Sequence, residues 1–444
     1  MKKIFSNITA LFLLTAFAHA QETVYPAKDA KGKIYITNGT VHVGNGTVLE
    51  NATIEVSDGK IVKVSTGGSA PSGDKVFDAK GKHVYPGLIL PSTDLGLKEI
   101  ASGVRGSNDF SELGDYNSSV RSIVAYNTDS KFINLLKANG ILLASITPEG
   151  GVISGSSSVV QLDAWNWEDA SYKMDAGIHV NMPSFIARGG RRGGFPEGFP
   201  GGFGGGAGRG GDPLKAAFDK VEEIKAFFNE AKAYNQESSH KETNLKLEAV
   251  KGLFDKKQKL FVHGDQVKQM LLAIDFVKEF GFDVVIIGGS ESYQIAELLK
   301  QNNIAVILGE EHALPAMEDD DVDQPYKTPA VLQKAGVLFA LNDTHSTSRY
   351  RNLSFNAGTA ATYGLTKEQA LQAITLNAAK ILGVDDRTGS LEVGKDANIV
   401  ICDGDILDMK SSNVSNAFIQ GRQVSLDNKQ KQLFERYKYK YGIK

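Results

Sequence analysis

The sequence has little cysteine and no excess of charge of one sign. Its single cysteine, Cys402, excludes an intramolecular disulfide, and its place in the apolar run "ANIVICDGD" indicates a thiol buried in a strand. The 49 basic and 52 acidic side chains leave a formal net charge of −3. This balance gives no electrostatic reason to expect a nucleic acid or an anionic membrane as a partner.

The sequence also lacks an apolar run long enough to span a membrane. The nearest to one, in residues 1–20, falls well short of the ~20 residues that a spanning helix needs. Two lysines precede this run, it continues through Phe17, and the small-x-small sequence "AHA" follows just before Gln21. This order predicts a cleaved signal peptide over residues 1–20 and a periplasmic or secreted mature protein, with an uncleaved anchor as the alternative.

Two β-rich pieces flank a long region of alternating strands and helices. Residues 33–84 alternate apolar and polar side chains between Asn-Gly and Asp-Gly turns, and short strands return in residues 390–426. Between them, in residues 85–385, apolar runs such as "GILLASI", "KLFVH", "DVVII", "IAVIL" and "GVLFAL" alternate with helical periodicity. The pattern predicts an α/β protein, with a (β/α)8 TIM-like barrel and a small composite β-sandwich domain built from both chain ends.

Two further segments stand apart from this pattern. Residues 188–211 are rich in glycine and arginine, with no period that could bury a core, and they predict a flexible insertion. Such a composition can also bind RNA or aromatic surfaces, but an insertion between a barrel strand and a helix is the preferred interpretation. Residues 427–444 form a basic, tyrosine-rich tail that is typical of a solvated terminal helix.

Several longer motifs resemble one family. The stretches "GKHVYPGLI", "NGILLASITPEGG", "FVHGDQV" and "ITLNAAKILG", with "GSLEVGKDANIVI" after them, are similar to the metal-dependent amidohydrolase superfamily, nearest its imidazolonepropionase-like branch. The likeness covers most of residues 33–425. It implies a barrel whose active site lies at the carboxyl ends of its strands, beside a β-domain made from both chain ends.

The resemblance also implies a metal site, and most of its ligands are missing. In the family, a divalent metal polarises an amide carbonyl and lowers the pKa of a bound water to ~7. Two histidines end strand one, further histidines end strands five and six, and an aspartate ends strand eight. Carried over in that order, these positions fall on Ser92, Asp94, His263, Gly288 and Thr344. The Thr344 assignment assumes that no residue is inserted, and Asp343 and His345 lie on either side of it. Only His263 keeps the family's residue unambiguously, which predicts an inherited frame with replaced ligands.

Two interpretations of the remaining polar residues stay open. Nitrogen and carboxylate groups at strand ends could regroup around one zinc-like divalent metal. Alternatively, Asp94 caps a turn, His263 is a hydrogen-bonded core histidine, and no metal binds. The first interpretation assigns Asp343 a catalytic role and makes His263, Asp94 and His345 metal ligands. It leaves three residues to bind substrate: Asp265, Ser92 and Thr344.

These interpretations predict two functional classes. One is a hydrolase acting on a carbon–nitrogen bond, other than a peptide bond, of a small or cyclic amide through an atypical or single-metal site. The other is a catalytically silent barrel that binds a ligand or partners an active homologue. Both expect a small-molecule ligand, and the resemblance leaves open a homo-oligomer or a hetero-oligomer with a homologous amidohydrolase.

Overall fold

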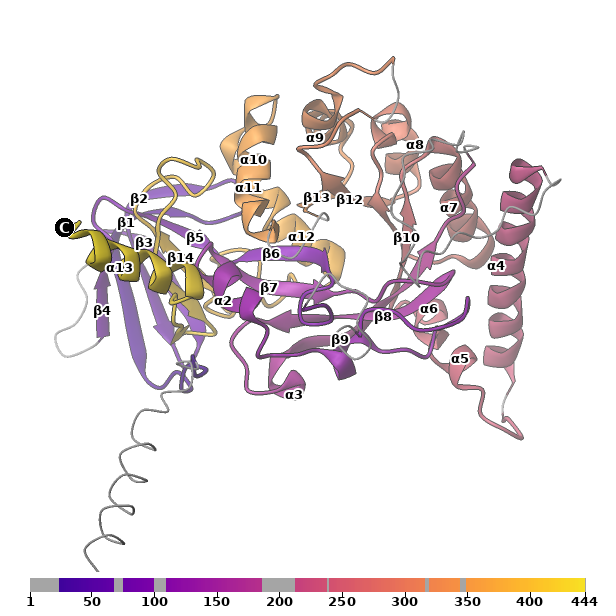
Figure 1. Ribbon diagram of the computed structural model, residues 1–444, viewed down its shortest axis with the longest axis horizontal. Coiled ribbons are helices and arrows are strands. Elements are labelled where there is room, and N and C mark those ends of the chain that lie inside the picture. Colours follow the sequence, from indigo (N-terminus) through magenta and orange to yellow (C-terminus); the bar gives the residue numbers. More distant parts are fainter. Residues whose placement is uncertain are drawn as a thin grey trace, which may run out of the picture.

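A computed structural model describes most of the chain and contains one barrel and one separate β-sheet. It describes residues 24–67, 75–99, 109–185, 212–237, 239–315, 319–343 and 349–443. The predicted signal peptide, the insertion at 188–211, and the candidates Thr344 and His345 lie outside these residues. In Figure 1 the sheet built from the two chain ends, indigo and yellow, lies beside the barrel, and helix α4 (Pro213–Gln236) lies at the opposite end of the molecule.

The barrel is a sheet of eight strands in the order β13-β12-β11-β10-β9-β8-β7-β6. Its strands are β6 (Leu88–Thr93), β7 (Ile141–Ile146), β8 (Ile153–Gln161), β9 (Ser171–Asn181), β10 (Lys259–Gly264), β11 (Val284–Gly288), β12 (Ala305–Glu310) and β13 (Phe339–Asn342). All five apolar runs expected as strands are strands here. The first and last strands meet where Asn342 Nδ2 donates a hydrogen bond to the backbone oxygen of Ser92 at 2.9 Å. This nearly closed barrel, with the separate sheet, confirms the predicted fold class.

One strand departs from the parallel pattern. Strand β8 runs antiparallel to both β7 and β9, whereas the other neighbouring strands of the barrel pair in parallel. Segment 147–152, between β7 and β8, is too short for the helical crossover that parallel neighbours need. The expectation of strand–helix units throughout is therefore wrong at this point.

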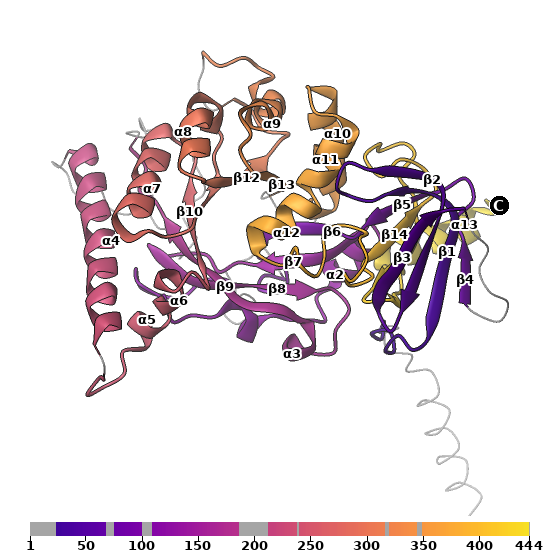
Figure 2. The same cartoon turned by 180° about the vertical axis from the view of Figure 1, so that it is seen from behind.

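Helices lie between the barrel strands and after the last one, and they cover the barrel. They are α2 (Lys131–Lys137), α3 (Trp167–Ala170), α5 (Leu245–Glu248), α6 (Lys251–Phe254), α7 (Val267–Phe280), α8 (Ala296–Gln301), α9 (Gln324–Ala335), α10 (Leu353–Thr362), α11 (Lys367–Ala373) and α12 (Leu376–Leu382). Seen from behind in Figure 2, α7, α8 and α9 stand over the strand ends on the side away from the second sheet. Helices α7 and α9 end at glycines with positive φ, Gly281 and Gly336, which stop each helix without backbone strain. No helix in the described ranges is both long and apolar enough to cross a membrane.

The second sheet joins the two chain ends. Its path is β16-β15-β14-β5-β1-β2-β3, with β4 also paired to β1. The early strands are β1 (Lys33–His42), β2 (Val48–Ser57), β3 (Lys60–Thr66), β4 (Lys75–Asp78) and β5 (His83–Pro86); the late strands are β14 (Ile399–Cys402), β15 (Val414–Ile419) and β16 (Arg422–Gln423). Strands β5 and β14 pair antiparallel, with Val84 opposite Ile401. The early and late pieces therefore form one continuous hydrogen-bonded sheet.

The alternation of side chains gives this sheet two buried faces. In β14, Ile399 and Ile401 belong to the sheet's own apolar core, whereas Val400 and Cys402 belong to the core of the barrel. Successive residues of a strand point to opposite faces, so one short strand contributes to both cores. The Cys402 thiol is buried and free, as the sequence predicts.

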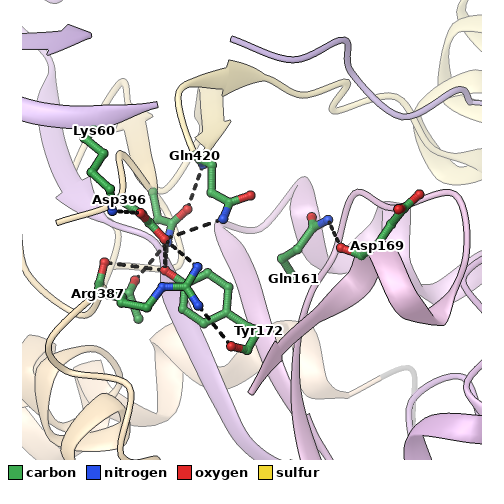
Figure 3. Close-up of polar contacts among 9 residues, drawn as sticks. Lys60, Gln161, Asp169, Tyr172, Arg387, Asp396 and Gln420 are labelled. Atoms are coloured by element: carbon green, nitrogen blue, oxygen red, sulfur yellow. Dashed lines mark hydrogen bonds and ion pairs between the residues drawn. The ribbon is translucent and has the colours of Figure 1, made fainter. Parts of the chain in front are cut away.

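A polar cluster also connects the two bodies (Figure 3). The carboxylate of Asp396 is 5% exposed and accepts hydrogen bonds from the Tyr172 hydroxyl on β9 and from Lys60 Nζ on β3, the latter at 2.5 Å. Arg387 Nη2 lies 3.1 Å from the same carboxylate. Burial opposes ionisation of Asp396, yet these three partners outweigh it and lower the pKa of Asp396 below its ordinary value. The barrel and the sheet are therefore held together by a buried charge with several donors.

Candidate functional site

Two adjoining hollows open at the carboxyl ends of the barrel strands. The first has a volume of ≈ 610 Å³ and is bounded mainly by residues at the ends of β10, β11 and β12. The second, of ≈ 390 Å³, is bounded mainly by residues that follow β6 and β7. Three residues line both hollows: Asn181, His263 and Ile287. His263 therefore lies at the junction, at the end of the barrel where this architecture places active sites.

His263 forms a pair with a second histidine. His179 Nδ1 lies 2.8 Å from His263 Nε2, so one ring donates a hydrogen bond and the other accepts it. The neighbouring strands β9 and β10 bring the two rings together, and His179 stacks on Phe261 with ring centroids 4.8 Å apart. His179 is buried, and its Nε2 has no hydrogen-bond partner among the described residues.

Burial keeps both rings neutral at pH 7. It lowers the pKa of His263 to about 4, and it lowers the pKa of His179 well below the ordinary value, with His263 adding to the effect. A neutral imidazole can bind a metal or accept a proton, but a pKa of about 4 makes His263 a weak base. Sequence reasoning missed His179, although the run "GIHVN" places it near the end of a strand.

The two candidates at the carboxyl end of strand β6 have protein partners of their own. Ser92 Oγ donates to Thr147 Oγ1 at 3.2 Å. Asp94 accepts a hydrogen bond from the Tyr350 hydroxyl at 2.5 Å, and Lys98 Nζ lies 3.7 Å from its other oxygen. Ser92 and Asp94 line the second hollow together with His263, so the structure brings these three candidates to one cavity.

Gly288, at the end of β11, cannot be replaced simply by a larger residue. Its φ is +101°, and a Cβ atom there would lie 2.6 Å from Oδ1 of Asp265. The Asp265 carboxylate also accepts a hydrogen bond from the backbone nitrogen of Ser290 at 3.3 Å. Asp265 thus occupies the space into which a side chain at position 288 would project.

Asp343 follows β13 and is fully buried. Asn356 Nδ2 donates to its Oδ2 at 3.4 Å. Asp343 is not among the residues that line either hollow. Its catalytic role stays a prediction, as do the roles of Thr344 and His345, which lie outside the described residues.

The metal interpretation can be tested on the donor groups that the structure places. Within the described ranges, no three histidine, cysteine, aspartate or glutamate side chains are arranged to hold a metal ion. Asp94 is engaged by Tyr350 and Lys98, and one nitrogen of His263 is engaged by His179. The described residues alone therefore do not form a metal centre.

Two glutamates at the end of β12 extend the site beyond the sequence-based candidates. Glu310 forms an ion pair with Arg349. Glu311 is 2% exposed, and its Oε2 has no hydrogen-bond partner among the described residues. Burial raises the pKa of Glu311 well above the ordinary value for a glutamate. Sequence reasoning missed both, although "IAVILGEEH" places two acids at the end of an apolar strand.

Comparison with known proteins shows which sequences this chain resembles. The sequence profile of the Amidohydrolase family matches residues 220–424. The chain is 24% identical over 376 residues to an imidazolonepropionase of Thermoplasma volcanium, covering 80% of this chain and 85% of that protein. It is 31% identical over 169 residues to an imidazolonepropionase of Picrophilus torridus, covering 38% of this chain and 40% of that protein.

Solved structures agree with the sequence comparisons. An amidohydrolase from Thermotoga maritima superposes with a TM-score of 0.73 at 26% identity, over 88% of this chain and 99% of that one. Molinate hydrolase, at 16% identity and a TM-score of 0.53, covers 90% of this chain and 96% of its own length, which shows a shared fold alone. Members of the Amidohydrolase family are generally metal-dependent. Together these comparisons show that the chain is similar to the amidohydrolase superfamily, nearest its imidazolonepropionase-like branch.

Proposed function

We propose that this protein hydrolyses a carbon–nitrogen bond, other than a peptide bond, in a small amide held at the carboxyl ends of the barrel strands. The observation that carries the proposal is the position of His263, a neutral and partly exposed imidazole where the two hollows meet. The similarity to imidazolonepropionases and to the Thermotoga amidohydrolase supports the same reaction class.

The proposed site is atypical. His263, Asp94 and His345 remain the predicted ligands of a single divalent metal, and Asp343 remains the predicted catalytic carboxylate. The chain's own contribution is to orient the substrate between two polar hollows. His179 fixes the ring of His263 through the 2.8 Å contact, which leaves the other ring nitrogen of His263 for a ligand.

An amide panel tests the proposal. The purified protein is assayed for amine or ammonia release from lactams, imidazolones and linear amides, and its metal content is measured by elemental analysis without chelator. His263→Ala should lower the rate at least about 100-fold, the lower bound for losing a group that acts directly on the reacting atoms. His240→Ala, at a histidine paired with Glu237 away from the barrel mouth, is the matched control and should retain the rate.

A second candidate function is a silent barrel that binds a ligand or partners an active homologue. The position of Asp265 against Gly288 favours it, because a side chain at position 288 would meet that carboxylate. Absence of turnover across the panel, together with less than about 0.1 metal per chain and a ligand-dependent rise in melting temperature, would favour this candidate over the hydrolase.

We also propose that the protein is exported, on the basis of the first 20 residues alone. Sequencing the N-terminus of the native protein should give Gln21 as the first residue. Recovery of intact Met1 from a membrane fraction would instead identify an uncleaved anchor.

A further inference from the structure

We propose that the first hollow selects a small amide that carries a positive charge, such as a primary amine or a guanidinium. The inference deepens the function proposed above and rests on it for the amide group. The charge selectivity comes from a different set of residues, those at the ends of β10, β11 and β12.

Carboxyl side chains are prominent in the lining of this hollow. Four carboxyl side chains line it: Asp265, Glu310, Glu311 and Asp320. Among the described residues that line it there is one histidine, His263, and no lysine or arginine. The potential inside such a hollow favours a cation and disfavours an anion, because low-dielectric walls strengthen the field of the carboxylates.

Three of the four carboxyl groups already have a partner in the protein. Glu310 pairs with Arg349, Asp320 accepts a hydrogen bond from the Tyr293 hydroxyl at 2.7 Å, and Asp265 accepts one from the Ser290 backbone at 3.3 Å. These contacts hold the carboxylates around the hollow and reduce the need of each for a further cation.

Glu311 is different. Its side chain is 2% exposed, it lines the hollow, and its Oε2 has no hydrogen-bond partner among the described residues. Buried polar groups in native proteins are nearly always satisfied, and a buried carboxyl without a partner is costly. A cationic group entering the hollow would supply the missing donor and the compensating charge together.

The rest of the lining fits the stem of such a ligand. Met182, Ile287 and Leu308 present apolar surface to the same hollow, and His263 connects it to the second hollow. A ligand with a cationic end near Glu311 and a short apolar stem would therefore direct its amide toward the junction of the two hollows.

Three probes of matched length test the charge preference by calorimetric binding to the full-length mature protein. They are 6-aminohexanamide, which is cationic, heptanamide, which replaces the ammonium with a methyl group, and adipamic acid, which is anionic. The cationic probe should bind at least about tenfold tighter than heptanamide, as expected for one charge-assisted hydrogen bond. Adipamic acid should bind more weakly than heptanamide.

Two substitutions locate the preference. Glu311→Gln keeps the shape of the side chain but cannot ionise beside a bound cation, so it should abolish most of the tenfold preference and change the affinity for heptanamide much less. Asp265→Asn, at an exposed carboxylate of the same hollow, should reduce the preference by a smaller factor and guards against misfolding of the first variant. Glu230→Gln, at an exposed position on α4, is the matched control and should leave all three affinities unchanged.

Several outcomes would overturn the inference: equal binding of the cationic and neutral probes, a preference for adipamic acid, binding of no probe at millimolar concentration, or a preference that survives in both hollow variants. Cation-selective binding without any hydrolysis would support this inference and contradict the proposed hydrolase. Hydrolysis of heptanamide in preference to 6-aminohexanamide would support the hydrolase and contradict this inference.

Discussion

Single residues at the strand ends restrict how this barrel mouth can change. Gly288 combines a positive φ with a carboxylate directly in front of its missing Cβ, so neither its backbone nor its surroundings accept a larger residue without movement. Glu311 keeps a buried carboxyl without a partner for its Oε2 among the described residues. Both features are costly to stability, which is common at sites that serve function.

Gly288→Ala should destabilise the protein by about 2 kcal/mol, because the new methyl group meets Asp265 Oδ1 and the backbone is held at a φ that alanine avoids. The measurement is urea unfolding of the single variants and of the double variant with Asp265→Ala. The double variant should recover the part of the loss that is due to the collision. An additive result would contradict the contact. The control is Gly309→Ala, where a Cβ would make only an ordinary contact, 3.9 Å from Cα of Gly288.

Glu311→Gln should make the protein more stable than the wild type at high pH. Because burial raises the pKa of Glu311 in the folded state, the folded protein holds a proton that the unfolded chain has released. The free energy of unfolding of the wild type therefore falls as the pH rises above the ordinary value of 4.5, and a glutamine has no such dependence. Unfolding at pH 5 and pH 8 should show the gap between variant and wild type widening with pH; a constant gap would argue against a buried carboxyl.

Elements of the two bodies meet through polar clusters, one of which surrounds the buried carboxylate of Asp396. Tyr172 on β9 and Lys60 on β3 reach its carboxylate from opposite sides of the junction. The β14 strand adds apolar contacts to both cores at the same junction. The relative placement of barrel and sheet thus depends in part on this charge and on one short strand. Arg422 on β16 adds a further ion pair with the buried Asp163 of the barrel.

Asp396→Asn should lower the free energy of unfolding by about 2 kcal/mol at pH 7, since it weakens hydrogen bonds from two cations and a hydroxyl to a buried carboxylate. A carboxyl with a lowered pKa stabilises the fold above its ordinary value of 3.8 and loses that contribution as the pH falls through its folded pKa. The difference from wild type should therefore shrink in acid. Asp169→Asn, whose backbone oxygen accepts from Gln161 in Figure 3, is the control and should have little effect.

On the scale of the whole molecule, the sheet depends on both ends of the described chain, whereas helix α13 (Lys429–Tyr441) adds no buried residue to either body. No residue of α13 is buried. Ending the chain after Asn428 should therefore change the melting temperature by less than about 2 °C. Ending it after Gly389 removes β14–β16 and should make residues 33–84 sensitive to limited proteolysis; resistance of that piece would show that it folds independently.

Much of the architecture could be predicted from the sequence, because short apolar runs and glycine turns encode strands locally. The runs "KLFVH" and "DVVII" lie in strands β10 and β11, as predicted. The antiparallel direction of β8 was not predicted, because a run such as "ISGSSSVVQ" does not indicate which strand it pairs with. The site was harder still. His263 was found by its motif. The local sequence places His179 and Glu311 near strand ends, but it does not indicate that both are buried or that His179 contacts His263 from the neighbouring strand.

The pairing of β5 with β14 has a consequence for the order of folding. Roughly 300 residues separate the two strands, and closing so long a loop early costs chain entropy before any contact repays it. Until β14 arrives, β5 keeps an open hydrogen-bonding edge of the kind that promotes aggregation. Since β5 leads almost directly into β6, and β14 follows α12, a formed barrel holds both strands at one place. The barrel therefore acts as the template on which the sheet closes, and slow barrel formation would appear as aggregation through the early strands.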